Sequence, residues 1–142
     1  MTIAAILTGK GSDVLSVECA TSVRDAIALL ADNKIGSLPV TRDGAVAGIM
    51  SERDIIYCLR SHGDQILDYK VEQVMSAPAI TVTRDVAVLA ALSMMTKRRI
   101  RHLPVVEGER LIGIVSIGDL VAYRIGRIEE EAEAMRSYIQ SA

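Results

Sequence analysis

The sequence predicts an α/β (α+β) fold in which two β-α-β-β-α repeats pack as one pseudo-twofold module. The first observation behind this prediction is that Leu-Pro-Val occurs at 38–40 and again at 103–105, an offset of 65 residues (103 − 38). The second is that the same offset superposes GIMS at 48–51 on GIVS at 113–116 without a gap. The third is the composition of the 142 residues, 50% hydrophobic and 24% charged, which predicts a packed core and excludes wholesale disorder.

The duplication divides the chain into five parts. These are an N-terminal segment at 1–13, a first repeat at 14–60, a linker at 61–78, a second repeat at 79–125 and a C-terminal helix at 126–142. Neither repeat of about 47 residues is expected to be stable alone, because domains this small bury too little surface. We therefore expect the apolar sheet face of one repeat to pack against that of the other, leaving two related clefts at the seam.

Each repeat begins with a short β-rich segment, VLSV at 14–17 and ITV at 80–82, followed by an amphipathic helix. The apolar residues of each helix recur at the spacing of a single helix face. They are Val23, Ala26, Ile27 and Leu30 in the first repeat and Val88, Ala91, Leu92 and Met95 in the second. Gly36 is expected to end the first helix.

A strand carrying Leu-Pro-Val follows in each repeat. Its proline is suited to a strand end or to an edge strand rather than to a central position. Asp-Gly at 43–44 and Glu-Gly at 107–108 predict hairpin turns. The next strand, at 45–50 or 111–115, runs directly into a second helix that begins at a serine.

Outside the repeats, 61–64 is expected to be a linker and 71–75 a short helical turn, and a helix from about residue 128 to 140 follows Gly126. That helix carries an apolar stripe at spacings of three and four residues. The stripe, together with the apolar N-terminal segment, either supplies contacts outside the repeats or packs onto its own module. The stripe residues are Ile125, Ile128, Ala132, Met135 and Ile139, and those of the N-terminal segment are Ile3, Ile6 and Leu7.

Composition disfavours two classes of function. The chain has no Phe or Trp, four Tyr and a net charge of −2, so it lacks both the stacking platforms and the basic balance of a nucleic-acid binder. The mean hydropathy is +0.30, but no apolar run approaches the roughly 20 residues that span a bilayer. With no signal peptide apparent and two cysteines read as reduced thiols, we expect a cytoplasmic protein.

The most informative motif is Ser-x-x-Asp at the start of each second helix, Ser51 with Asp54 and Ser116 with Asp119. One interpretation is a capping-box variant, in which the serine accepts from a helix amide and the carboxylate favours the positive helix end. The other is a ligand site, because helix N-terminal amides bind phosphate and a carboxylate can accept both ribose hydroxyls. The two interpretations are compatible.

With Leu-Pro-Val and Gly-hydrophobic-hydrophobic-Ser-x-x-Asp in both halves, the chain resembles a pair of cystathionine β-synthase (CBS) domains, a Bateman module. It resembles small stand-alone bacterial CBS-pair proteins and the ligand-binding repeats of the AMP-activated protein kinase γ subunit. The resemblance implies a non-catalytic regulatory module that binds AMP, ADP, ATP or NAD, or in some members S-adenosylmethionine. It also implies a homodimer and the possibility of an unidentified effector protein.

The same resemblance implies roles for individual residues. Ser116 would contact the phosphate or ribose and Asp119 would bind the ribose diol, while Arg101, His102 and Arg53 would meet the phosphate. The expected nucleotide site comprises Arg53, Ile80, Val82, Arg101, His102, Ser116 and Asp119, and a possible second site comprises Ser37, Ser51 and Asp54.

The offset further predicts that the two clefts are unequal. Arg53 aligns with Gly118, and Arg101 and His102 align with Gly36 and Ser37. The cleft at Ser116 and Asp119 is therefore expected to hold a tight nucleotide and the other to be weak or empty.

Two alternatives to this interpretation remain at this stage. The module could serve only for dimerisation, with empty clefts, or its basic run at 97–101 could bind nucleic acid. Cys58 and His62 are spaced to clip a metal, but no third ligand is apparent, so no metal site is expected. No catalytic motif is present in the sequence, and no enzyme activity is expected.

Overall fold

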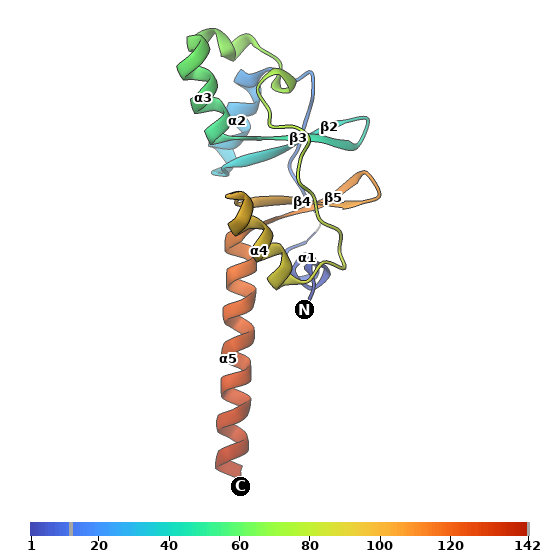
Figure 1. The fold of residues 1–142 in the computed structure, drawn as a ribbon, viewed down its shortest axis with the longest axis vertical. Coiled ribbons are helices and arrows are strands. Elements are labelled where there is room, and N and C mark those ends of the chain that lie inside the picture. The colour runs from blue at the N-terminus through green and yellow to red at the C-terminus, as the bar shows by residue number, and fades with distance from the viewer. Residues whose placement is uncertain (12, 142) are drawn as a thin grey trace.

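The computed structural model describes residues 1–11 and 13–141. Residue 12, which the sequence assigns to the N-terminal segment, and residue 142, assigned to the C-terminal helix, lie outside the described residues. The two repeats form two lobes stacked along the long axis, and the C-terminal helix projects away from the second lobe (Figure 1). No helix within the described residues is both long enough and apolar enough to cross a membrane.

The predicted order of elements is found in both lobes, except that the leading strand of the second repeat is reduced to a single bridge. The first lobe contains β1 (Val17–Glu18), α2 (Val23–Asn33), β2 (Ser37–Arg42), β3 (Ala45–Ser51) and α3 (Glu52–His62), and the second contains α4 (Val88–Arg98), β4 (His102–Glu107), β5 (Arg110–Ser116) and α5 (Ile117–Ser141). Outside these lie α1 (Ile3–Lys10) and the 3₁₀ turns η1 (Gly63–Asp68) and η2 (Val71–Gln73), the latter within the predicted turn. The leading strands are shorter than predicted, since β1 has two residues and 80–82 contributes one bridge, from Val82 to Val105.

Two predicted boundaries are wrong. Ser61 and His62 are not linker but the last turn of α3. The C-terminal helix does not start afresh after Gly126, because α5 runs unbroken for 25 residues. A single glycine costs a helix only about 1 kcal/mol relative to alanine and removes no backbone hydrogen bond, so it does not end a helix without a further breaker.

The strands form one sheet in the order β1-β2-β3-β5-β4. The β2–β3 and β4–β5 hairpins share a register at the offset of 65: Leu38 lies opposite Met50, and Leu103 opposite Val115. Within the described residues, β3 of one hairpin and β5 of the other pair at a single position, Ala45 with Arg110. The sheet is therefore two hairpins joined by a narrow contact.

Each lobe has its own hydrophobic core, which corrects the expectation that the two apolar sheet faces pack on each other. Leu38, Val40 and Met50 pack with residues of α2, η1 and η2. Leu103, Val105 and Val115 pack with residues of α1, α4 and α5. The lobes can fill separate cores because each recruits a segment that the sequence analysis placed outside the repeat.

These recruited segments are equivalent to each other. In the first lobe, the Val23 amide donates to the Tyr69 carbonyl at 2.8 Å; in the second, the Val88 amide donates to the Met1 carbonyl at 3.1 Å. Ile3, at the start of α1, is fully buried in the second core. The N-terminal segment thus packs onto its own module, which was one of the two alternatives that the sequence left open for it.

The glycines of GIMS and GIVS lie where these segments cross the hairpins. A Cβ at Gly48 would lie 2.6 Å from the Ser76 carbonyl oxygen and 2.7 Å from Met75 Sδ. A Cβ at Gly113 would lie 2.8 Å from Leu7 Cδ2. The two close approaches explain why both hairpins carry glycine at this position.

Candidate functional site

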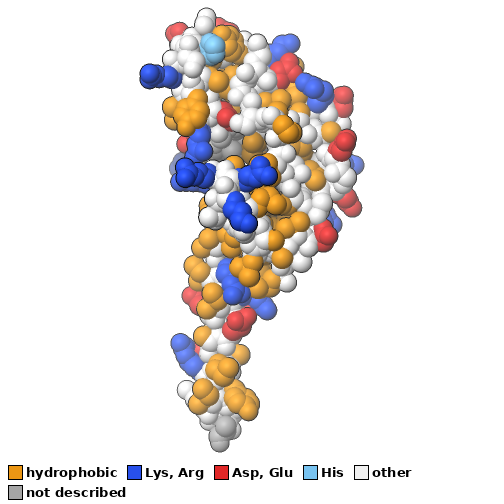
Figure 2. Space-filling model, viewed as in Figure 1, with side chains coloured by type: hydrophobic (Ala, Val, Ile, Leu, Met, Phe, Trp, Pro, Cys, Tyr) orange, Lys and Arg blue, Asp and Glu red, His pale blue; other side chains and the backbone are white. Residues whose placement is uncertain are grey.

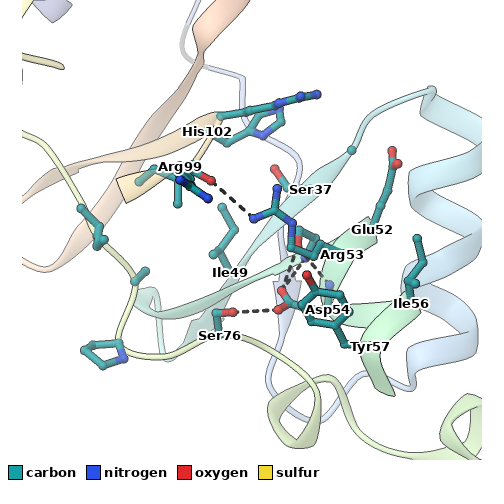
Figure 3. A pocket seen from close by; sticks show the side chains of 17 residues that line it. Ser37, Ile49, Glu52, Arg53, Asp54, Ile56, Tyr57, Ser76, Arg99 and His102 are labelled. Carbon is teal, nitrogen blue, oxygen red and sulfur yellow. Dashed lines mark hydrogen bonds between the residues drawn. The ribbon is translucent and has the colours of Figure 1, made fainter. Parts of the chain in front are cut away.

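A cavity of about 580 Å³ lies at the seam between the lobes (Figure 3). Its walls come from the start of β2, the N-terminus of α3, the connection at 76–80 and the loop at 99–102. The cavity is therefore built from both repeats. Apolar side chains cover part of it: Ile49, Ile56, Tyr57, Pro78, Ala79, Ile80 and Ile100.

Ser51 and Asp54 form a complete capping box at the α3 end of this cavity. The Asp54 amide donates to Ser51 Oγ at 3.2 Å, and the Ser51 amide donates to Asp54 Oδ2 at 2.9 Å. The other carboxylate oxygen, Asp54 Oδ1, accepts from the Ser76 hydroxyl at 2.8 Å. The box thus fixes a carboxylate at a helix N-terminus, with one oxygen held only by a hydroxyl that a ligand diol could replace.

Three arginines line the same cavity as Asp54. Arg53 follows the cap in α3, and its Nη1 donates to the Arg99 carbonyl across the seam at 3.5 Å. Arg99 ends α4 in the left-handed region, with φ of 54°, and Arg101 lies two residues later. Lys and Arg side chains gather at the level of the seam on this face of the molecule (Figure 2). The site combines a carboxylate with a cationic wall, which suits a ligand carrying both a diol and an anionic group.

A second cavity of about 450 Å³ lies on the Ser116 side of the seam. The capping arrangement repeats beside it, with the Asp119 amide donating to Ser116 Oγ at 3.1 Å; Ser116 lines this cavity, whereas Asp119 is not among the residues that line it. Its carboxylate is already paired, because Lys10 Nζ lies 2.6 Å from Asp119 Oδ2 and also donates to the Ile114 carbonyl at 3.0 Å. Partial burial raises the pKa of Asp119, but the hydrogen bonds from Lys10 and the Ser116 amide outweigh it and hold that pKa below its ordinary value.

His102 and Ser37 line both cavities and so lie between them. Burial, reinforced by the charge of Lys10, lowers the pKa of His102 from its ordinary value of 6.5. Ser37 is 5% exposed, and its Oγ has no hydrogen-bond partner among the described residues.

The structure regroups the predicted site residues. Arg53, Arg101 and Ile80 lie with Ser51 and Asp54, not with the motif of the second repeat as the sequence predicted. The Arg101 carbonyl accepts from the Ile117 amide, so the Arg101 backbone stays in its own repeat while its side chain lines the cavity across the seam. An alignment of repeats shows which residues are equivalent, but not on which side of the seam each side chain lies.

Val82 lies outside both cavities. It is 3% exposed within the second core, and its amide donates to the Pro104 carbonyl. Sequence reasoning missed Lys10, Ser76 and Arg99. Arg99 had a signal, its place in the basic run, but Lys10 had none, because its partner lies 109 residues away.

Comparison with known proteins gives a consistent result. The family model described as "CBS domain" matches residues 10–61 and 71–126. The chain is 37% identical over 139 residues to the mitochondrial CBS domain-containing protein CBSX3 of Arabidopsis thaliana, covering 93% of this chain and 68% of that protein.

Several solved structures of CBS-domain proteins are also similar to this chain. The CBS-domain containing protein ATU1752 from Agrobacterium tumefaciens is 35% identical, with a TM-score of 0.81 over 87% of this chain and 92% of that one. The CBS domain pair of MJ0100, solved with 5-methylthioadenosine and S-adenosyl-L-methionine, is 25% identical (TM-score 0.78; 89% and 98% covered). CBSX2, solved with AMP, is 27% identical (TM-score 0.70; 80% and 88% covered).

Proposed function

Since the chain belongs to the CBS domain family, as a tandem pair of such domains, we propose that it is a regulatory module that binds an adenosine-containing small molecule. We assign the ligand to the cavity at Ser51 and Asp54. The observation that carries this assignment is the convergence of Arg53, Arg99 and Arg101 on the cavity that holds the Asp54 carboxylate. The solved pairs that hold AMP, or methylthioadenosine and S-adenosylmethionine, support this class of ligand.

In this proposal the Asp54 carboxylate binds the ribose diol. The capping box already orients it, so little conformational freedom is lost when the ligand binds. Ser76 moves aside, and the hydrogen bond it gives up is replaced by one from a ribose hydroxyl. The Asp119 carboxylate is a poorer candidate, because its Oδ2 is already paired with the ammonium of Lys10 and Asp119 is not among the residues that line the second cavity.

The arginines select for phosphate. Guanidinium groups form charge-assisted bonds to phosphate oxygens, and each such bond contributes about 1.5–3 kcal/mol where it is partly desolvated. Adenine would lie against the apolar wall that includes Ile49 and Ile80. We therefore propose a nucleotide such as AMP, ADP, ATP or NAD in preference to a neutral nucleoside.

The module is proposed to be regulatory rather than catalytic, with the ligand acting by different affinities for two states. A homodimer, a cytoplasmic location and an unidentified effector protein remain part of the proposal. A ligand-free dimerisation module is the alternative. Binding of nucleic acid is a weaker one, because the chain is acidic overall.

Calorimetry with AMP and adenosine tests the assignment. Asp54→Asn should weaken both ligands at least tenfold, because both carry the diol, whereas Arg101→Gln should weaken AMP far more than adenosine. Asp119→Asn is the matched control and should leave both affinities unchanged, with thermal melting showing that each variant is folded.

The reverse pattern, with Asp119→Asn abolishing binding and Asp54→Asn leaving it intact, would move the site to the second cleft. Failure of the wild-type chain to bind AMP, ADP, ATP or NAD would favour the dimerisation alternative.

A further inference from the structure

Helix α5 extends well beyond the lobe that it starts from (Figure 1). Its first turns are anchored, since Leu120 is fully buried and Tyr123 packs against the second core. From 127 to 141 every residue is exposed. A helical segment of that length is marginal in water by itself, so its stability calls for a packing partner.

The exposed part of α5 carries a regular apolar seam. The seam residues are spaced four, three, four, three and four apart, an average near 3.5, which is the repeat of a coiled coil rather than of a helix lying on a globular core. Ile128 is 48% exposed, Met135 60% and Ile139 65%. The a positions are Ile125, Ala132 and Ile139, and the d positions are Val121, Ile128 and Met135.

The charges beside the seam select one pairing. In a parallel, in-register pair, Arg124 at position g faces Glu129 at position e of the second copy, and Glu131 at g faces Arg136 at e. Both contacts join opposite charges, and symmetry doubles them. In the fully overlapping antiparallel pair, Glu131 faces Glu131 and Glu129 faces Glu129 of the second copy, which places like charges together.

We propose that α5 pairs with α5 of a second copy of this chain as a parallel, in-register two-stranded coiled coil. Isoleucine at two of the three a positions favours two strands in a parallel coiled coil. Arg136 bonds Glu133 of its own helix at 3.3 Å, and at 71% side-chain exposure it is free to reach Glu131 of the second copy instead. The pairing brings the second lobes of two modules together at one end of the assembly.

Sedimentation equilibrium of the full chain tests the seam. The wild type should have twice the mass of the 15.3 kDa chain. Ile128→Glu/Met135→Glu buries two carboxylates in the seam and should raise the dimer dissociation constant at least a hundredfold. Ala134→Glu/Ser137→Glu adds the same charge on the outer face and should leave it unchanged. A wild-type monomer, or equal dimerisation by both double variants, would overturn the proposal.

Disulfide trapping tests the orientation. With Cys58→Ser to remove the partly exposed native thiol, Ile139→Cys should oxidise to a covalent dimer, because two a positions meet in the parallel pair. In the antiparallel pair Ile139 lies opposite Val121, and the two thiols are about 27 Å apart (18 residues at about 1.5 Å each). Ser137→Cys, on the outer face, is the control. Trapping through position 137 but not 139 would refute the seam.

A charge exchange tests the register. Glu131→Arg and Arg136→Glu should each weaken the dimer at least threefold, and the double variant should restore wild-type affinity. No rescue in the double variant would refute the in-register pairing.

Discussion

Alanine at Gly48 and at Gly113 should have unequal costs although the two positions are equivalent in the duplication. At Gly48 the new methyl would lie 2.6 Å from the Ser76 carbonyl oxygen. That carbonyl is not free to retreat, because the Ile49 amide donates to it at 3.0 Å and the Ser76 amide donates back to the Ile49 carbonyl at 2.9 Å. At Gly113 the three atoms nearest to the methyl all belong to the Leu7 side chain, the nearest being Cδ2 at 2.8 Å, and none of them is backbone.

The magnitudes follow from these contacts. Overpacking costs about 1–3 kcal/mol, and disturbing one of the backbone hydrogen bonds adds about 1 kcal/mol, so Gly48→Ala should lower the free energy of unfolding by about 2–4 kcal/mol. Gly113→Ala should lower it by about 1 kcal/mol or less, because a rotamer change of Leu7 relieves most of the clash. Gly9→Ala, with nothing within 4 Å of its Cβ, is the control and should be neutral or stabilising.

Urea unfolding followed by far-ultraviolet circular dichroism measures all three variants, since the chain has no tryptophan to serve as a fluorescent probe. Equal costs at the two glycines would refute the reasoning from a fixed carbonyl and a movable side chain. So would a Gly48→Ala variant as stable as the control.

Three further predictions concern charge and helix propensity. Because its pKa is lowered, His102 binds fewer protons in the folded state than in the unfolded state. The wild type should therefore lose stability as the pH falls below about 6.5, whereas His102→Gln should not. Urea unfolding at pH 7.5 and 5.5 would show the difference. Lys10→Gln should cost about 1 kcal/mol or less at pH 7, and this loss should vanish in acid as Asp119 protonates; a constant loss across pH would exclude the ion pair as its cause. Gly126→Ala should stabilise the helix by about 0.5–1 kcal/mol and increase the helical signal, whereas a decrease would mean that α5 bends at Gly126 in solution.

The parts of the fold that depend on local pattern were predictable. The offset of 65 located both hairpins, whose registers agree at Leu38 and Leu103. The Ser-x-x-Asp motifs were correctly read as helix caps, with Ser51 and Asp54 forming a full capping box. Their nucleotide-binding role stays a prediction.

The parts that depend on contacts between the two lobes were not predictable. The side chain of Arg101 joins the cavity of the other repeat, and nothing in a one-dimensional alignment distinguishes the two sides. Lys10 reaches Asp119 because α1 crosses to the second lobe, a path that no spacing in the sequence reports.

The crossing of the two segments also bears on how such a module could arise by duplication. The strand-helix unit at 14–60 is completed by residues that follow it, such as Ile66 and Val71, and the unit at 79–125 by residues that precede the first unit, such as Ile3 and Leu7. A chain with only one unit and its leading arm would therefore carry that arm on the wrong side to fill its own core. Two such chains could fill both cores by exchanging arms, so an ancestor with a single repeat would have been an obligate, arm-swapped dimer. Joining two such units in one chain would turn the exchange between molecules into a path within one.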